Sequence, residues 1–533
     1  MMYRVLAFTV TILLMSCNVI ENQQNNSDIP RIVSVSPEYN STNQPTHGPI
    51  SVEFSVAMDT TTINSSTLSL DPETLGNFTY SADKKTVTFT PENPLLEGTT
   101  YTVTMAGTIK SAKGHSLPAS VFSFTTDRWQ GIKLNGVIES KTGGSALATD
   151  SQGNIWVAGS TDGDLNGNLG TAHNDAFLIK YSSLGERLQT ILHGGEGDTF
   201  PSSLTIDNDD NLYIAGFTTG SLGGESLVGD SDAFISKFDK HGEWQWTQFT
   251  GESSTVSEVN ELVLDEDGFI YVAGSIQPDN KTSKMFVAKL DPITGDLNKA
   301  IFSVGTNEQL IPGGIAVDSN LNVFIAGRTS ASFDNVSMTG TGFNAFITKL
   351  NANLSQKTTE LFGAEQLDLY VTDLLTDSDG HLIVVGNTSG TGTLHSQSIK
   401  GIKDTFFVEF DTNFTRQWTA LYGEPNAQSG AESAFLDSSG NMYIVGDTYS
   451  SLSGNSYGGT GDAFISKLTS IGQTLWTRQF GASGGSTYGY DIKVDNYGNV
   501  FVTGESFVGL NGNVRIGTSD VFIAKYNSDG ELQ

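Results

Sequence analysis

The chain has 533 residues, enough for about three or four domains, and a hydrophobic content of 37% that can fill real cores. Its 59 glycines and low charged fraction of 16% favour short strands joined by tight turns. The formal charge of −31 argues against nucleic acid and against electrostatic docking on anionic lipid, because both need a basic patch. The single cysteine excludes a disulfide framework within the chain and any cysteine-cluster metal centre.

The first residues have the pattern of a secretion signal. Arg4 precedes an apolar run from Val5 to Met15 that is too short to span a bilayer as a mature helix. The run ends in Leu-Met-Ser-Cys, and Cys17 is the one cysteine of the chain. This segment resembles the lipobox of bacterial lipoproteins. The resemblance implies cleavage of residues 1–16 as a signal peptide and lipidation of Cys17; the alternative is an ordinary signal peptide with a chance cysteine.

The residues after the cysteine bear on location. Asn18 is not the Asp that retains enterobacterial lipoproteins in the inner membrane. We therefore expect a lipid-anchored protein of the bacterial cell envelope, in the outer membrane or on the cell surface rather than in the inner membrane. Residues 17–29 are polar and without periodicity after the cysteine, which predicts a flexible tether.

Residues 30–126 alternate apolar and polar side chains with period two, which predicts the short strands of a β-sandwich. The clearest strands are expected at residues 32–35, 50–54, 86–89 and 101–104. Four segments resemble the SbsA-type bacterial Ig-like domain: FSVAMD at 54–59, VTFTP at 87–91, LEGTTY at 96–101 and FSFTT at 122–126. The resemblance implies a spacer or stalk without a binding role of its own.

Seven copies of one unit fill residues 127–533, at a spacing of about 58 residues. Each has an apolar strand, an Asp-initiated turn, a second strand ending in Gly, a variable loop and a third strand with a Phe. The turns begin at Asp150, Asp207, Asp265, Asp318, Asp377, Asp437 and Asp495. Most units then show a fourth strand, and four short strands per unit make a propeller blade. These repeats resemble the SBBP family of bacterial β-propeller repeats, which implies an all-β fold: an Ig-like β-sandwich followed by a seven-bladed β-propeller.

The two ends of the repeat region predict how the ring closes. The seventh unit has only the beginning of a fourth strand, from Gly530, whereas an orphan segment at residues 129–136 precedes the first unit. The spacing from Trp129 to Gly136 equals that from Trp244 to Gly251 in the fourth strand of the second unit. We therefore predict that residues 129–136 complete the last blade.

The Asp-rich turns resemble the start of a calcium loop, but they lack the Glu at position twelve and the flanking helices of an EF-hand. An Asx turn explains all seven. One loop between strands is a better calcium candidate, because its oxygen donors alternate at Asp162, Asp164, Asn166 and Asn168. Related loops without these acids occur in other units, so a recurring loop conformation is the alternative reading. No other cofactor is expected.

Two further sets of acids recur in the repeats. The Asp at the start of most third strands, as at Asp175, is expected to accept backbone hydrogen bonds beside the loop. Four residues before the turn Asp, three units carry a carboxylate on the strand expected to line the channel: Glu261, Asp373 and Asp491. They could gather at one channel mouth and bind a cation or a cationic ligand; the alternative is three solvated acids on separate strands.

Nucleophilic catalysis finds no support, because the sequence has no Gly-x-Ser-x-Gly elbow with a partnered His and no phosphate-binding loop. The seven histidines show no metal-ligand pair. We predict a monomeric, non-catalytic lipoprotein whose propeller presents a protein- or glycan-binding surface on an Ig-like stalk. Recognition would lie in variable loops such as Thr161–Asn174, Thr329–Phe343 and Thr388–Lys403. The alternatives are a polysaccharide-active hydrolase or lyase that uses the channel carboxylates, and a periplasmic assembly scaffold.

Overall fold

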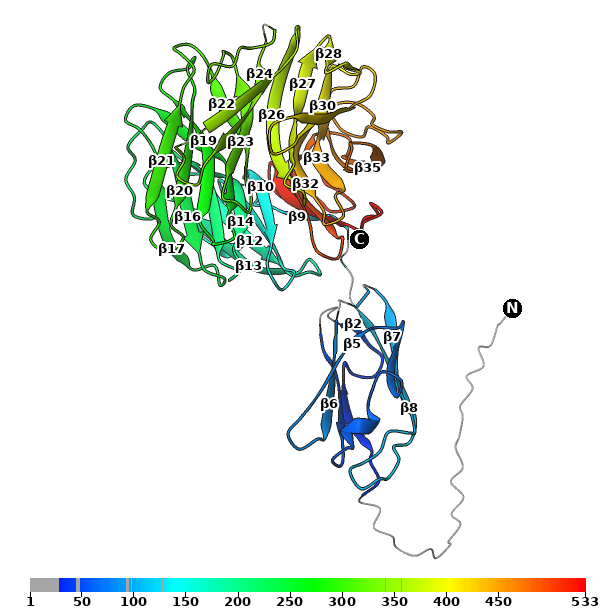
Figure 1. Ribbon diagram of the computed structural model, residues 1–533. Helices are drawn as coiled ribbons and strands as arrows, with labels where there is room; N and C mark the ends of the chain where they lie inside the picture. Colours follow the sequence, from blue (N-terminus) through cyan, green and yellow to red (C-terminus); the bar gives the residue numbers. More distant parts are fainter. Residues whose placement is uncertain are drawn as a thin grey trace, which may run out of the picture. The chain divides into compact units, whose positions relative to one another are not determined.

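A computed structural model describes residues 28–44, 48–92, 95–96, 98–126, 129, 131–171, 173–340, 342–355 and 357–533. The chain divides into two compact units, residues 1–128 and 129–533 (Figure 1). The predicted leader and the lipidation site at Cys17 lie outside the described residues. Strands dominate the described part, which also has two single-turn 3-10 helices, Thr60–Thr62 and Leu165–Gly167. No helix in those ranges combines the length and hydropathy needed to cross a bilayer.

The first unit is a sandwich of two four-stranded sheets. One sheet has the order β1 (Ile32–Ser36), β3 (Ile50–Phe54), β6 (Thr86–Pro91) and β5 (Gly76–Tyr80); the other has β2 (Ser41–Gln44), β8 (Ser120–Thr126), β7 (Thr100–Met105) and β4 (Leu68–Asp71). Inward side chains from both sheets, such as Phe54, Val87, Val103 and Phe124, form one buried core. This alternation of buried and exposed residues is the period-two pattern of the sequence, because successive strand side chains point to opposite faces.

The second unit contains seven four-stranded sheets, numbered here one to seven in chain order. Their strands are β10 (Thr142–Thr149), β11 (Ile155–Thr161), β12 (Asp175–Tyr181) and β13 (Arg187–His193); β14 (Thr199–Ile206), β15 (Leu212–Thr218), β16 (Asp232–Phe238) and β17 (Trp244–Phe249); β18 (Val256–Leu264), β19 (Ile270–Gln277), β20 (Lys284–Leu290) and β21 (Leu297–Phe302); β22 (Leu310–Val317), β23 (Val323–Thr329), β24 (Asn344–Leu350) and β25 (Lys357–Phe362); β26 (Leu367–Thr376), β27 (Leu382–Gly390), β30 (Lys403–Phe410) and β31 (Arg416–Tyr422); β32 (Ser429–Leu436), β33 (Met442–Thr448), β34 (Asp462–Leu468) and β35 (Thr474–Phe480); and β36 (Thr487–Val494), β37 (Val500–Ser506), β38 (Asp520–Tyr526) and β9 (Lys133–Asn135). A small hairpin, β28 (Thr393–Leu394) and β29 (Gln397–Ser398), lies in the loop before β30.

The first strands of the seven sheets contact one another in sequence, from β10 through β14, β18, β22, β26 and β32 to β36, and β36 returns to β10. They are therefore the innermost strands of a ring (Figure 1). The predicted fold class, an Ig-like sandwich followed by a β-propeller, is confirmed.

The ring closes through strand pairing between the two ends of the propeller. Strand β9 pairs antiparallel with β38, with Leu134 opposite Phe522. The last residues complete the same outer edge, because Leu532 bridges Tyr526 and the N–H of Gly131 donates to the carbonyl of Gln533 at 2.6 Å. The outer strand of sheet seven is thus made of two pieces from opposite ends of the unit, which confirms the predicted closure.

The recurring Gly and Phe form a cross-strand pair inside each sheet. The pairs are Gly159–Phe177, Gly216–Phe234, Gly274–Phe286, Gly327–Phe346, Gly386–Phe406, Gly446–Phe464 and Gly504–Phe522. A Cβ at Gly274 or Gly386 would overlap both the opposite ring and a carbonyl oxygen of the first strand. Glycine is therefore required there because backbone and ring approach too closely for any side chain.

The Asp at the start of the third strand holds the loop that precedes it. Asp232, for example, accepts hydrogen bonds from the N–H groups of Val228 at 2.6 Å and Gly229 at 2.9 Å. Equivalent bonds reach Asp175, Asp404, Asp462 and Asp520. The structural role expected for this Asp is confirmed.

The seven Asp-initiated turns share one geometry. Each Asp accepts from the N–H groups two and four residues later, as Asp150 does from Gln152 and Asn154. The third residue after the Asp has a left-handed backbone in all seven turns; it is Gly in five, and Asp210 and Leu321 in the others. The Asx-turn interpretation is confirmed.

Replacing Trp129 by Ala should strongly destabilise the propeller. Trp129 is fully buried, with its ring centroid 6.1 Å from that of Phe501 in sheet seven. Loss of a buried Trp costs about 3–5 kcal/mol, so thermal unfolding should show a clear drop in Tm. The matched control is Trp244→Ala, since Trp244 has the equivalent place in sheet two but is 46% exposed. Equal shifts in the two variants would contradict the closing role of the segment around Trp129.

Candidate functional site

The innermost strand of every sheet carries a β-bulge at the same place. The register shifts between Val259 and Glu261 in β18, between Val371 and Asp373 in β26, and at the equivalent residues of the other five. A bulge leaves one residue unpaired and redirects the side chains around it. Residues at the bulges of all seven sheets consequently line one central cavity of about 230 Å³.

The structure brings Glu261, Asp373 and Asp491 together around this cavity. Each carboxylate also accepts a hydrogen bond from a backbone N–H of the next sheet. The bonds run from Ile315 to Glu261, from Ala434 to Asp373 and from Leu147 to Asp491, each at 2.8 Å. In all three, the donor follows the residue that occupies the equivalent channel position. The carboxylates therefore connect neighbouring sheets around the channel.

Two more side chains join this ring. Lys493 Nζ lies 2.9 Å from Asp491 Oδ1, and Ser433 Oγ donates to the same oxygen at 2.9 Å. Ser433 also reaches Asp373 Oδ2 at 3.4 Å. The sequence reasoning missed Lys493, although it stands two residues after Asp491 on one strand and period two places both on the same face.

Burial and mutual repulsion shift the protonation of the ring. Burial raises the pKa of Glu261 well above its usual value, and the charge of Asp373 adds to that shift. Burial also raises the pKa of Asp373 to about 6, against the opposing effects of the Ala434 N–H and Lys493. Burial alone would lower the pKa of Lys493, but Asp491, Asp373 and Glu261 more than offset it and the pKa ends above its usual value. The ring thus combines an ammonium with carboxyls that retain protons more readily than usual.

The size of the cavity limits what this ring can do. A carboxyl with a raised pKa beside an ionised carboxylate is the arrangement used in general acid catalysis. However, about 230 Å³ is below the range of roughly 300–1,000 Å³ typical of small-molecule pockets. Each of the three acids also has a structural use between sheets. The ring therefore fits water or a single small cation better than a sugar chain, and cation binding there stays a prediction.

The calcium-loop candidates are engaged in hydrogen bonds within their loop and to residues beside it. Asp162 accepts from the N–H of Lys141 at 2.7 Å, and Asp164 accepts from the N–H of Gly170 at 2.8 Å. The Asn166 amide donates to Thr190 Oγ1 and the Asn168 amide to the Leu165 carbonyl. These bonds account for the four residues through loop conformation, and calcium at this loop stays a prediction.

A cluster of tyrosines lies at the end of the strands from which the variable loops leave. We call Tyr449, Tyr457, Tyr488 and Tyr490 the tyrosine patch. The rings of Tyr488 and Tyr490 are stacked at 6.4 Å between centroids. Tyr449 and Tyr490 are 41% and 36% exposed. Burial, together with a hydrogen bond to Tyr488, raises the pKa of Tyr449, so residues of sheets six and seven meet here.

Carboxylates flank the tyrosine patch. Burial raises the pKa of each of Glu432, Asp447 and Glu505. Burial also raises the pKa of Tyr490, and the charges of Glu505, Glu432 and Asp447 add to the effect. The patch was not predicted, because Tyr449 and Tyr488 belong to different sheets and nothing local in the sequence links them.

Replacing Asp373 by Asn should stabilise the protein above pH 6 and change little near pH 4. The folded protein keeps Asp373 protonated up to about pH 6, whereas an ordinary Asp loses its proton near its usual pKa of 3.8. The stability due to this carboxyl therefore falls as the pH rises between these two values. Asn mimics the protonated form, and a shift of this size corresponds to on the order of 3 kcal/mol. Tm measured from pH 4 to 8 tests this. The exposed Asp209→Asn serves as control, and parallel pH profiles for wild type and Asp373→Asn would contradict the assignment.

Comparison with known families agrees with this architecture. A model of the bacterial Ig-like domain matches residues 26–126. A model of the SBBP beta-propeller repeat matches residues 130–166, 188–223, 302–334 and 475–509. The match at 188–223 begins in β13 of sheet one and ends beyond β15 of sheet two. The sequence repeat is therefore offset from the sheet by one strand, which is the offset that closure of the ring requires.

Individual relatives are distant. The chain is 23% identical over 478 residues to the regulatory protein FlaEY of Caulobacter vibrioides, covering 84% of this chain and 44% of FlaEY, so it spans less than half of that relative. A protein of unknown function from Dyadobacter fermentans is 12% identical, with 63% of this chain and 98% of that one covered and a TM-score of 0.40. XC5397 of Xanthomonas campestris, a gluconolactonase, is 14% identical, with 60% and 87% covered and a TM-score of 0.31.

At TM-scores below 0.5, these two structures say nothing of what this chain binds or catalyses. No catalytic function is shown for this chain by the family matches or the curated relative. The family matches, in contrast, coincide with the two units of the structure. The chain carries a bacterial Ig-like domain followed by a β-propeller built from SBBP repeats.

Proposed function

We propose that this chain is a non-catalytic binding protein of the bacterial cell envelope whose propeller recognises a glycan or protein ligand at the tyrosine patch. In this proposal the Ig-like unit is a stalk, and lipid on Cys17 anchors a monomer to the outer membrane. The observation that carries the binding role is the tyrosine patch with its flanking carboxylates.

The chemistry of the patch suits recognition. Tyr rings offer a large contact area with few rotatable bonds, and their hydroxyls can pair with polar groups of a ligand. Tyr is accordingly among the residues that dominate binding energy in interfaces. The adjacent Glu432, Asp447 and Glu505 supply acceptors for the hydroxyls of a sugar or the amides and cations of a protein.

The variable loops leave the propeller from the same end of the strands as the tyrosine patch, which supports a binding role for that face. The loop from Tyr449 to Gly461 follows β33 and includes Tyr457, which is 36% exposed. In sheet five the corresponding loop folds into the hairpin of β28 and β29, so loop structure differs between sheets while the strands repeat. Loops on a rigid scaffold are where binding specificity is usually placed.

Removal of aromatic rings from the patch should abolish binding. Purified protein would be screened on a glycan array and against purified envelope and matrix proteins. The double change Tyr449→Ala and Tyr490→Ala is expected to weaken any specific ligand at least about tenfold, which is the loss of one interface hot spot. The control is Tyr497→Ala, because Tyr497 is also exposed on sheet seven, at 53%, but lies in its Asp-initiated turn, at the other end of the strands. A ligand that binds all forms equally would place recognition elsewhere.

The anchor has its own test. Several acyl chains on one residue would hold the protein stably, since each buried CH₂ contributes about 0.8 kcal/mol. Cells fed a labelled fatty acid should incorporate label into the wild type and lose it in Cys17→Ser. Proteinase added to intact cells should then remove the propeller if it is displayed on the surface, with a lysed sample showing that cleavage is possible. Unlabelled wild-type protein would refute the anchor while leaving the binding proposal standing.

A further inference from the structure

Six of the seven sheets repeat one cross-strand pair near the Asp-initiated turn. An aromatic residue on the second strand lies opposite a Lys on the third. The pairs are Trp156–Lys180, Tyr213–Lys237, Tyr271–Lys289, Phe324–Lys349, Tyr443–Lys467 and Phe501–Lys525. In each, the ammonium lies 4.8 to 5.8 Å from the ring centroid, which is the range of a cation–π contact.

The carboxylate of the turn Asp in these sheets faces side chains that donate hydrogen bonds to it. Lys180 forms an ion pair with Asp150 at 2.9 Å in sheet one. In five of the six sheets an Asn four residues after the Asp donates its amide to the carboxylate, as Asn322 does to Asp318 at 2.7 Å. The turn carboxylate thus accepts from a side-chain amide in five of these sheets, and a Lys ammonium lies within 3.8 Å of it in sheets one and three.

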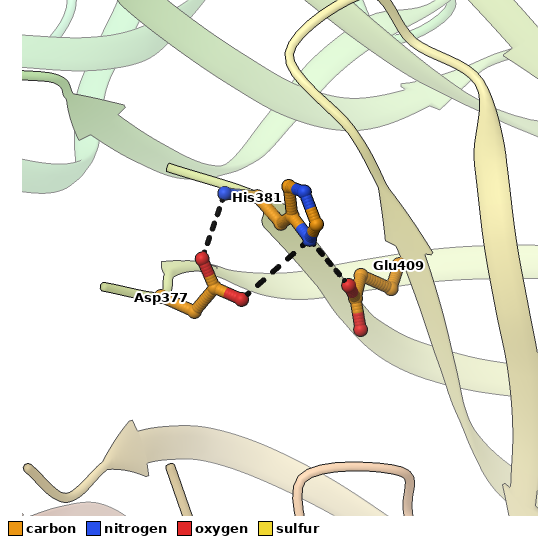
Figure 2. A group of neighbouring side chains, drawn as sticks. All are labelled: Asp377, His381 and Glu409. Carbon is orange, nitrogen blue, oxygen red and sulfur yellow. Dashed lines mark hydrogen bonds and ion pairs between the residues drawn. The ribbon is translucent and has the colours of Figure 1, made fainter. Parts of the chain in front are cut away.

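Sheet five differs at all three positions. Ile383 replaces the aromatic residue, Glu409 replaces the Lys and His381 replaces the Asn. The change exchanges a positive charge for a negative one beside Asp377. Figure 2 shows the outcome: His381 Nδ1 lies 2.8 Å from Glu409 Oε1 and 3.7 Å from Asp377 Oδ2. A cluster of one imidazole and two carboxylates replaces the aromatic–Lys pair.

The backbone holds this cluster in position. Asp377 Oδ1 accepts from the N–H groups of Asp379 and His381, as in every turn of the propeller, and Oδ2 is directed at the imidazole (Figure 2). Glu409 lies on β30 directly opposite Ile383 on β27, so strand pairing fixes the position of its Cα as well. Asp377 and Glu409 therefore leave the backbone at a turn position and a strand position that recur in every sheet of the ring.

The donors match what a metal ion needs. The nitrogen of His381 and one oxygen each of Asp377 and Glu409 all lie within 4.8 Å of one another, and in the described part of the chain this is the group that meets that condition. Bonds of about 2.0–2.2 Å from a tetrahedral ion place its donors roughly 3.3–3.6 Å apart. The His381–Asp377 distance of 3.7 Å is close to this value, and the His381–Glu409 distance of 2.8 Å would lengthen when an ion enters. A mixed imidazole and carboxylate set suits zinc and similar transition metals, whereas calcium and magnesium prefer all-oxygen sites.

The cluster is also accessible. It lines a cavity of about 860 Å³ between sheets five and six, together with Trp418 and Asp437. The His381 side chain is 32% exposed and that of Glu409 is 11% exposed, so an ion can reach the donors from solvent. Three protein donors would leave at least one coordination position open toward the cavity, as in zinc sites that bind a further ligand.

We propose that Asp377, His381 and Glu409 form a binding site for a divalent transition metal ion of the zinc class, with its open position facing the cavity between sheets five and six. This site is separate from the tyrosine patch and from the central channel. Sheet five carries it because it alone exchanges the Lys of the third strand for an acid.

The test uses the whole protein, freed of metal by chelation and then titrated with zinc chloride in a calorimeter. One zinc per chain is expected, at least about a hundredfold tighter than magnesium or calcium. The double change His381→Asn and Glu409→Lys installs the residues of the other sheets, so it should fold and lose zinc affinity at least about a hundredfold. The control is His395→Asn, which removes another histidine near sheet five whose Nδ1 contacts Thr419.

A second measurement guards against effects on folding. Cobalt in place of zinc should give the intense visible absorption of a low-coordinate site in the wild type and His395→Asn, but not in the double variant. Thermal unfolding should show zinc raising the Tm of the same two proteins only. Absence of zinc binding, or binding that survives in the folded double variant, would overturn the proposal and leave the cluster as an ion pair between His381 and Glu409.

Discussion

The pairing of β9 with β38 is the interaction on which the rest of the propeller depends. Each sheet buries its faces against two neighbours, so sheet seven needs both its outer strand and its contact with sheet one. The buried cluster that contains Trp129 joins residues of sheets one and seven, including Leu147 and Phe501. A ring closed in this way protects its strand edges from pairing with other chains. It also sets the spacing of the seven inner strands, and hence the shape of the channel.

Repetition separates structural residues from candidates for function. Some residues recur because each makes the same local contact in every sheet that carries it. They are the turn Asp, the cross-strand Gly and Phe, and the Asp that begins the third strand. The tyrosine patch and the His381 cluster break that repetition. A scaffold that holds the repeated residues fixed can vary others at little cost, which is why departures such as Ile383 and Glu409 are informative.

The channel carboxylates show that an acid in a conspicuous place can be structural. Glu261, Asp373 and Asp491 each fill the gap that a bulge opens beside the next sheet, and each accepts a backbone N–H that would otherwise be buried without a partner. An unpaired buried N–H costs about 1–3 kcal/mol, so these acids have a purpose without any ligand. Burial, with repulsion between the acids added, raises the pKa of Glu261 and Asp373, and the Lys493 ammonium in the same cavity opposes the shift.

The amino-acid sequence by itself determined the two folds, the Asx turns, the recurrence of Gly and Phe on the second and third strands, and the strand that closes the ring. These features depend on backbone sterics and on period-two burial, which act over a few residues and repeat seven times. It also placed Glu261, Asp373 and Asp491 on the channel strands. Tertiary structure alone decided that their oxygens bind the next sheet, that Tyr449 meets Tyr488, and that Glu409 reaches His381 from 28 residues away. Those contacts join separate strands or sheets, so their distances follow from sheet pairing and ring geometry and leave no local pattern in the chain.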